Sequence, residues 1–338
     1  MKTAVVILNW NGADLLRRYL PSVIAGTDPS QGKVIVVDNG STDNSIQLLN
    51  QEYPAIELLP FSENYGFAEG YNRAIAILAK RFEYIVLLNS DVAVKPGWLT
   101  PLIAYLDANP DCAAVQPKLL SDTRRSHFEY AGAAGGFIDR NGYPYCRGRI
   151  FSVCEPDNGQ YDTPADVMWA SGAALTVRSS VYLSCGGLDK DFFAHMEEID
   201  LCWRMRLAGW KLAAVPASVV YHLGGGSLPA ENPRKTYLNF RNNLLMLHKN
   251  LPDSTRRSTL LRRRLLDTIA WTKYIATLDF KNAARHWRFS RQPRPHSESP
   301  RTRDNSVYFP SGPHHTGRSA ALSQCCIPSH PAPRKSYP

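Results

Sequence analysis

Four short polar clusters in the first third of the chain each follow an apolar run, and their side chains could bind a phosphorylated ligand. The central run, Ile85 to Leu88, has no polar alternation, which is typical of a strand buried on both faces of a parallel sheet. It ends at Asn89, Ser90 and Asp91. Because open α/β sheets bind ligands beyond the carboxyl ends of their strands, a carboxylate here could hold a divalent cation that neutralises a phosphate. An ordinary aspartate at the start of a turn explains Asp91 equally well.

The other three clusters follow earlier runs in the same way. Asn9-Trp10-Asn11-Gly12 follows residues 4–8, Asp38 follows residues 33–37, and Asn64-Tyr65-Gly66 follows residues 56–59. If these strands are neighbours, all four clusters lie along one edge of the sheet and could form a nucleotide pocket. The first loop lacks the pattern Gly-x-Gly-x-x-Gly, so a bound diphosphate would need a cation or basic side chains to balance its charge.

A second acidic cluster lies in the run Phe192-Phe193-Ala194-His195-Met196-Glu197-Glu198-Ile199-Asp200. Apolar neighbours would raise the pKa of Glu197 or Glu198, as a general base that works near neutral pH requires. Acids that stabilise the start of a helix are the ordinary alternative. His222 ends a short apolar stretch, and an isolated histidine acts as a metal ligand only where other site residues converge on it.

The elements that would position these residues alternate along the chain. Apolar runs predict strands at residues 4–8, 33–37, 56–59, 85–88 and 113–115, and helical spacing predicts helices at 13–24, 68–80 and 98–106. This alternation implies βαβ units and a mostly parallel sheet. Residues 118–165 show no clear period. A second ordered block follows, with strands predicted at 167–169 and 211–215 and helices at 178–183, 197–208 and 235–249.

Composition and charge exclude several classes of protein. The 338 residues are 44% hydrophobic, which is enough for one large core or two smaller ones. From Arg256 onward 16 Lys or Arg stand against 4 Asp or Glu, whereas the first 255 residues hold 23 basic and 26 acidic residues. A mildly acidic body with a basic end argues against a nucleic-acid groove.

Seven cysteines without a metal-site spacing suit a reducing cytosol. No run reaches the ~20 apolar residues of a membrane span, so we expect a soluble or peripheral protein without a signal peptide.

The end of the chain has a different character from the rest. Between residues 256 and 289, apolar residues recur at three- and four-residue steps among many arginines, and this predicts a basic amphipathic helix. Such a helix could contact a membrane surface or pack on its own domain. Residues 291–338 hold nine of the 24 prolines and no periodic apolar pattern, so we expect disorder. A native tail and a frame-shifted end both fit this stretch.

Taken in order, several motifs resemble those of family 2 glycosyltransferases with the GT-A fold, in particular the bacterial rhamnosyltransferase-like branch. The motifs of the first half are residues 6–12, 37–43, 64–72 and 88–91, and those of the second are residues 171–174, 186–189, 192–193 and 197–204. The resemblance covers residues 3 to 250. It implies an α/β fold with a Rossmann-like, mostly parallel sheet, flanking helices and C-terminal acceptor-side helices. Residues 1–117 would form the nucleotide-sugar-binding half, 118–250 the acceptor and catalytic half of the same domain, 251–290 a basic helical segment and 291–338 a tail.

The resemblance also implies a role for each matching residue. Asp91 and His222 would be metal ligands for Mg²⁺ or Mn²⁺, with Asn89 in place of the family's first motif acid. Glu198 falls at the position of the catalytic base, usually Asp, and Glu197 is the alternative if the register is shifted by one. The residues that would contact the nucleotide, ribose or diphosphate of the donor are Asn9, Asn11, Asp38, Asn64, Gly66, Asn72, Ser90, Arg204 and Arg206.

The implied function is an inverting glycosyltransferase for cell-surface polysaccharide synthesis. The donor would be dTDP-rhamnose, with UDP- or GDP-sugars as alternatives. The acceptor would be a glycan or lipid-linked glycan, and residues 256–289 could bring the chain to the inner face of the cytoplasmic membrane. No nucleic-acid partner is expected. The alternatives are a catalytically inactive sugar-nucleotide-binding protein and a nucleotidyltransferase, although the latter normally has a Gly-rich loop with a basic residue after the first strand.

Overall fold

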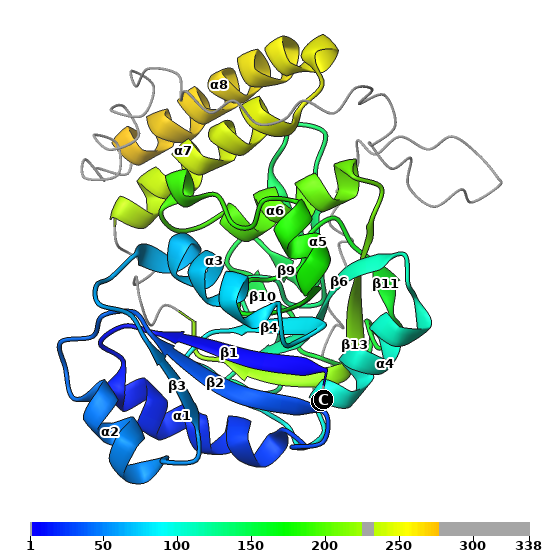
Figure 1. Ribbon diagram of the computed structural model, residues 1–338. Coiled ribbons are helices and arrows are strands. Elements are labelled where there is room, and N and C mark those ends of the chain that lie inside the picture. Colours follow the sequence, from blue (N-terminus) through cyan, green and yellow to red (C-terminus); the bar gives the residue numbers. More distant parts are fainter. Residues whose placement is uncertain (1, 225–232, 277–338) are drawn as a thin grey trace, which may run out of the picture. The chain divides into compact units, whose positions relative to one another are not determined.

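A mixed sheet runs through the centre of the protein (Figure 1). The computed structural model describes residues 2–224 and 233–276. Within them the sheet has nine strands in the order β11-β13-β6-β12-β4-β1-β2-β3, with β5 paired to β13. These strands are β1 Thr3–Asn9, β2 Gly32–Asp38, β3 Glu57–Pro60, β4 Tyr84–Leu88, β5 Val92–Val94, β6 Cys112–Ser121, β11 Ala165–Asp166, β12 Ala174–Arg178 and β13 Lys211–His222.

The parallel half of the sheet contains four of the strands that the sequence predicts. Strands β3, β2, β1 and β4 are neighbours and all pair in parallel, so the polar residues after them lie along one edge. β13 also pairs in parallel with β6, whereas β12 is antiparallel to both β4 and β6. The prediction of a mostly parallel sheet with flanking helices is therefore confirmed for the central strands.

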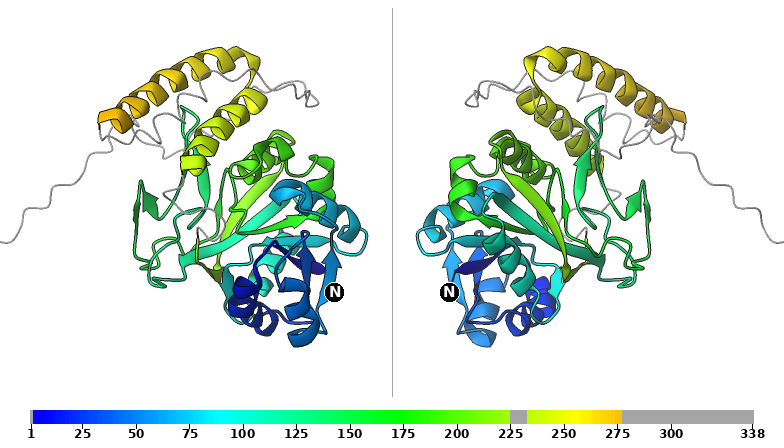
Figure 2. Two further views of the ribbon diagram at one scale, coloured as in Figure 1. Left: turned by 90° about the vertical axis from the view of Figure 1, so that its left-hand side faces the viewer. Right: turned by 90° about the vertical axis from the view of Figure 1, so that its right-hand side faces the viewer.

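Helices cover both faces of this sheet, as the two side views in Figure 2 show. One face packs against α1 (Ala13–Gly26), α2 (Ser45–Glu52) and α4 (Leu99–Ala108), and the other against α3 (Gly66–Leu78), α5 (Ser179–Ser184) and α6 (Glu197–Leu207). Since successive strand residues point to opposite faces, β4 contributes Ile85 and Leu87 to one core and Val86 and Leu88 to the other. This explains why the run is apolar throughout.

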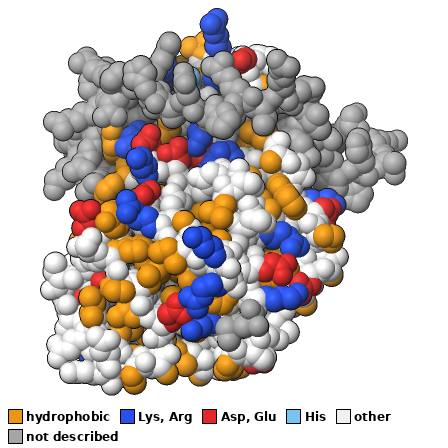
Figure 3. Space-filling view, viewed as in Figure 1, with side chains coloured by type: hydrophobic (Ala, Val, Ile, Leu, Met, Phe, Trp, Pro, Cys, Tyr) orange, Lys and Arg blue, Asp and Glu red, His pale blue; other side chains and the backbone are white. Residues whose placement is uncertain are grey.

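Two long helices follow β13 and lie one above the other in Figure 1: α7 (Pro233–Asn250) and α8 (Asp253–Ala276). The remaining elements are two small hairpins, formed by β7 (Gly136–Ile138) with β8 (Pro144–Cys146) and by β9 (Arg149–Ile150) with β10 (Val153–Cys154), and the short 3-10 helix η1 (Lys190–Phe192). All described residues belong to one compact unit. On the face shown in Figure 3, basic and acidic side chains are interspersed.

Several predicted elements differ from the structure. The strand predicted at 167–169 is wrong: β11 ends at Asp166, and Trp169 forms only an isolated bridge to Gly136. The strand predicted at 211–215 extends to His222 across Pro216, because a register shift after Val215 accommodates the missing N–H. The strands β5 and β12 were not predicted. The part of the predicted amphipathic helix beyond residue 276 and the tail 291–338 lie outside the described residues.

Candidate active site

The first part of the candidate site lies where β1 and β2 end. Asn9 and Asp38 are register partners, and both are fully buried. Asn9 Nδ2 donates to Asp38 Oδ2 at 3.0 Å, and the backbone N–H of Ser41 donates to Asp38 Oδ1 at 2.9 Å. Asn11, with φ at 50°, accepts the N–H of Thr42 on its side-chain oxygen at 2.7 Å. These bonds tie the two loops into one wall.

The loop after β3 continues this wall. Asn64 Oδ1 accepts hydrogen bonds from Asn39 Nδ2 at 3.0 Å and from the backbone N–H of Gly66 at 2.8 Å, at the start of α3. Asn72 lies on α3 and bonds the backbone of Leu188 through both its amide nitrogen, at 2.7 Å, and its amide oxygen, at 2.9 Å. Both asparagines therefore shape the loops around the site.

Asp91, His222 and Glu129 form a buried row at the end of β4 and β13. Asp91 Oδ1 lies 3.2 Å from His222 Nε2, and Glu129 Oε1 lies 3.4 Å from His222 Nδ1. Their side chains are 8%, 9% and 6% exposed. Burial alone would lower the pKa of His222, but its contacts with Asp91 and Glu129 raise it to about 10. The sequence interpretation included Asp91 and His222. It missed Glu129, which lies in the segment without clear periodicity.

Carboxylate oxygen and imidazole nitrogen suit Mn²⁺ or Mg²⁺ as ligands. Among the described residues no group of three His, Cys, Asp or Glu side chains could hold a metal ion. Asp91 and His222 would thus provide two ligands and leave other coordination positions for phosphate oxygens and water. A carboxylate beside the second ring nitrogen is the usual way in which a metal-binding histidine is oriented, and Glu129 occupies that position.

Glu197 and Glu198 begin α6 next to the same edge. A Cβ placed at Gly172 would lie 3.4 Å from Glu198 Cβ and Cγ, so Glu198 packs over Gly172. The adjacent carbonyl, that of Ala173, accepts the N–H of Asn89 at 3.0 Å, two residues before Asp91. Gly172 and Ala173, just before β12, thus contact both the start of α6 and the residue that follows β4. Burial raises the pKa of Glu198, and burial together with the charge of Glu198 raises that of Glu197 further.

The remaining predicted site residues are Ser90, Arg204 and Arg206, and they differ in burial and in bonding partners. Ser90 is half-buried beside Asp91. Arg204 bonds Asp200 and the carbonyls of Cys185 and Gly187. Arg206 is buried and bonds Asp166 and the carbonyl of Val167. The side chains of both arginines are committed to protein partners, which counts against the diphosphate contact expected of them.

Comparison with known proteins identifies the family of this chain. The model of the family described as Glycosyl transferase family 2 matches residues 4–146. The N-acetylglucosaminyl-diphospho-decaprenol L-rhamnosyltransferase of Mycobacterium tuberculosis is 30% identical over 232 residues, which cover 64% of this chain and 75% of that protein. The chain belongs to glycosyltransferase family 2. Another similar member is the rhamnosyltransferase WbbL of Escherichia coli, with 26% identity over 64% of this chain and 82% of WbbL.

Solved structures confirm the GT-A fold of this family 2 chain. GalNAc-T7 with UDP, GalNAc and Mn²⁺ superposes with a TM-score of 0.55 at 18% identity, covering 73% of this chain and 48% of that one. The mannosyltransferase PcManGT of Pyrobaculum calidifontis, with GDP-Man and Mn²⁺, gives a TM-score of 0.53 at 13% identity and covers 86% of both chains. At such identities the likeness concerns the fold alone.

Proposed function

We propose that this glycosyltransferase moves rhamnose from a nucleotide diphosphate donor to a hydroxyl group of a glycan acceptor, with inversion at the anomeric carbon. The observation that carries the proposal is the buried Asp91–His222 pair beyond β4, together with Glu198, which packs on Gly172 beside the residue that bonds Asn89. The rhamnosyltransferase relatives support the choice of sugar. dTDP-rhamnose is the proposed donor.

Asp91 and His222 would hold Mg²⁺ or Mn²⁺. The cation supplies positive charge that stabilises the departing diphosphate. The floor beneath the donor comes from the loops after β1, β2 and β3. Asn9, Asn11 and Asp38 would contact the nucleotide, Asn64, Gly66 and Asn72 would shape the region of the ribose and diphosphate, and Ser90 would line the donor beside Asp91.

Glu198 would take the proton from the acceptor hydroxyl. Its side-chain Oε2 has no hydrogen-bond partner among the described residues, and its pKa is raised by burial, so the carboxylate can accept a proton near neutral pH. The hydroxyl oxygen then forms a bond to the anomeric carbon as the bond to the diphosphate breaks on the opposite face. This single displacement needs no enzyme nucleophile.

One experiment tests donor and cation together. We would measure the thermal stabilisation of the protein by a panel of dTDP-, UDP- and GDP-sugars with and without Mn²⁺, and then assay transfer from the best donor. We expect the largest stabilisation from dTDP-rhamnose with Mn²⁺, and its loss in Asp91→Asn. Stabilisation without transfer or donor hydrolysis would favour an inactive sugar-nucleotide-binding protein. Undiminished Mn²⁺-dependent stabilisation of Asp91→Asn would refute the metal assignment.

The acceptor is proposed to be a lipid-linked glycan, as the name of the mycobacterial relative indicates for that protein. No described helix is long and apolar enough to cross a bilayer. The outer face of α8 instead suits a membrane surface. Leu261, Leu265 and Ile269 are 71%, 65% and 59% exposed and lie four residues apart, so they form one stripe. The exposed Arg262 and Arg264 flank it on opposite sides.

Apolar residues between arginines suit an anionic bilayer surface, with the side chains in the acyl boundary and the guanidinium groups at the lipid headgroups. The inner face of α8 is fixed, since Arg263 is 1% exposed and bonds Asn243. The test is co-sedimentation with vesicles of anionic and of neutral lipid. We expect binding to the anionic vesicles that Leu265→Asp weakens, whereas Thr268→Asp at the margin of the stripe weakens it less. Equal binding of both variants and wild type would refute this surface.

A further inference from the structure

Asn242 on α7 is buried and faces the segment that leads into α6. Its exposed fraction is 0%, and its amide nitrogen lies 2.8 Å from the carbonyl oxygen of Phe192, 2.8 Å from that of Ala194 and 2.7 Å from that of His195. One side chain thus bonds three carbonyl groups within a stretch of four residues. The sequence interpretation did not include Asn242, because it lies about 45 residues beyond the acidic cluster on an ordinary helix.

The backbone of this segment is strained. Phe193, His195 and Met196 have φ values of 66°, 69° and 75°, in the left-handed region that residues other than glycine seldom adopt. Such conformations persist only where surrounding contacts impose them, and they cluster at functional sites. A donor that meets several carbonyl groups at once provides such contacts. The neighbouring Arg241 adds a bond to the carbonyl of Asp191.

The strained segment ends where the proposed base begins. Met196 is followed directly by Glu197 and Glu198, the first residues of α6. Because the path of residues 192–196 sets where α6 starts, it also sets where the Glu198 carboxylate points. On the basis of the proposed function, we infer that Asn242 is a positioning residue for sugar transfer: it holds the backbone before α6 so that Glu198 meets the acceptor hydroxyl.

The next residue on the same helix provides a matched control. Asn243 is 2% exposed, and its amide nitrogen donates to the carbonyl of Gly142 at 2.8 Å while its oxygen accepts from Arg263. It therefore anchors the turn of the β7–β8 hairpin and α8, and has no bond to residues 191–198 in the described structure. The two asparagines are the same residue type and similarly buried, but they hold different segments.

The experiment compares Asn242→Ala and Asn243→Ala with the wild type. We would measure kcat for transfer, the dissociation constant of the donor and hydrogen exchange of backbone amides by mass spectrometry. Displacing a catalytic group by about 1 Å costs about 100-fold, so we expect that loss of kcat in Asn242→Ala with little change in donor affinity. Exchange should accelerate in residues 192–200. Asn243→Ala should instead accelerate exchange near residues 139–143 and keep most of kcat.

Asn242→Ser keeps one donor and covers the case in which Asn242→Ala does not fold; its kcat should lie between those of the wild type and of the alanine variant. Equal kcat losses in the variants at 242 and 243, or unchanged exchange in residues 192–200, would overturn the inference. If the wild type transfers no sugar with any donor, the proposed function fails. Faster amide exchange confined to residues 192–200 in the Asn242 variants would still show that Asn242 holds this segment. Unchanged exchange there would still refute that role.

Discussion

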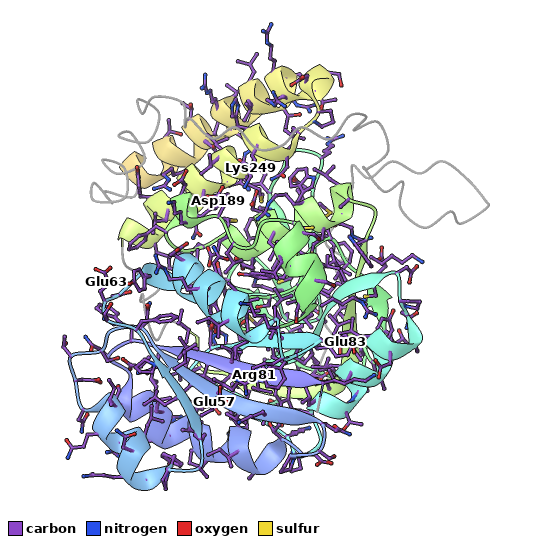
Figure 4. All side chains as sticks on the ribbon, viewed as in Figure 1. Glu57, Glu63, Arg81, Glu83, Asp189 and Lys249 are labelled. Carbon is purple, nitrogen blue, oxygen red and sulfur yellow. The ribbon has the colours of Figure 1, made fainter. Side chains whose placement is uncertain are left out.

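Replacing Lys249 by methionine should lower the free energy of unfolding by about 3 kcal/mol. Lys249 is labelled with Asp189 in Figure 4, and its Nζ lies 2.7 Å from Asp189 Oδ2 and 2.9 Å from Asp200 Oδ2. The Lys249 and Asp200 side chains are 8% and 0% exposed. Removing one partner of a buried ion pair costs about 3–5 kcal/mol. We expect the lower end because Arg204, at 2.8 Å, and Asn250, at 2.7 Å, still bond Asp200.

The assay is equilibrium unfolding in urea, with Lys211→Met as the control. Lys211 Nζ lies 2.7 Å from Asp111, but the two side chains are 64% and 55% exposed. Solvent screens such a pair, so its loss should change stability little. Equal costs for the two variants would refute the argument from burial.

The same comparison has a pH dependence. Burial alone would raise the pKa of Asp189, but its hydrogen bond to Lys249 and the charge of that residue lower it below the usual value. The contribution of ionised Asp189 to stability is therefore fully present above its unfolded-state pKa, about 3.9, and is lost as the pH falls through its folded-state pKa. The difference between wild type and Lys249→Met should shrink below about pH 4. A difference that stays constant down to pH 2 would exclude Asp189 as a contributor.

Three further predictions follow from single contacts. Glu129→Gln should weaken Mn²⁺ binding about 10- to 100-fold in a calorimetric titration, because the carboxylate beside His222, the proposed metal ligand, is lost. Hydrogen bonds from Arg81, with a contribution from Lys33, lower the pKa of Glu57 to about 2. Glu57→Gln should therefore cost about 1 kcal/mol of stability at pH 7 and progressively less as the pH falls from about 4 toward 2, where Glu57 becomes protonated. Gly136→Ala should cost about 3 kcal/mol in thermal unfolding, because its Cβ would lie 1.9 Å from the Trp169 ring.

Local patterns explain how much of this fold and site could be predicted. The apolar run of β4 and the polar residues after it are adjacent in sequence, so both the strand and the position of Asp91 at its end could be predicted. The insertion of β12 between β4 and β6 could not, because it depends on pairing between distant segments. Glu129 and Asn242 were missed for the same reason. Each acts on a residue more than 45 positions away, and neither lies in a motif of its own.

Glutamine at positions 197 and 198 should change different properties, and this separates the two candidate bases. Glu197 is 6% exposed, whereas Glu198 is only partly buried and packs over Gly172 at the end of the sheet that carries Asp91. A base must reach its substrate, so we expect Glu198→Gln to lower kcat about 100-fold or more, with donor affinity kept.

Glu197 should instead affect stability. Burial and the charge of Glu198 raise its pKa well above the usual value, so the folded state favours the neutral acid. The contribution of neutral Glu197 to stability is fully present below the unfolded-state pKa, about 4.3, and declines as the pH rises through the folded-state pKa. Glu197→Gln, which is neutral at every pH, should therefore stabilise the protein at pH 8 but not at pH 4, and keep most of kcat. A large loss of kcat in Glu197→Gln with normal turnover in Glu198→Gln would reverse the assignment. The carboxylate buried most deeply would then be the one that meets the acceptor, and α6 would have to move before transfer.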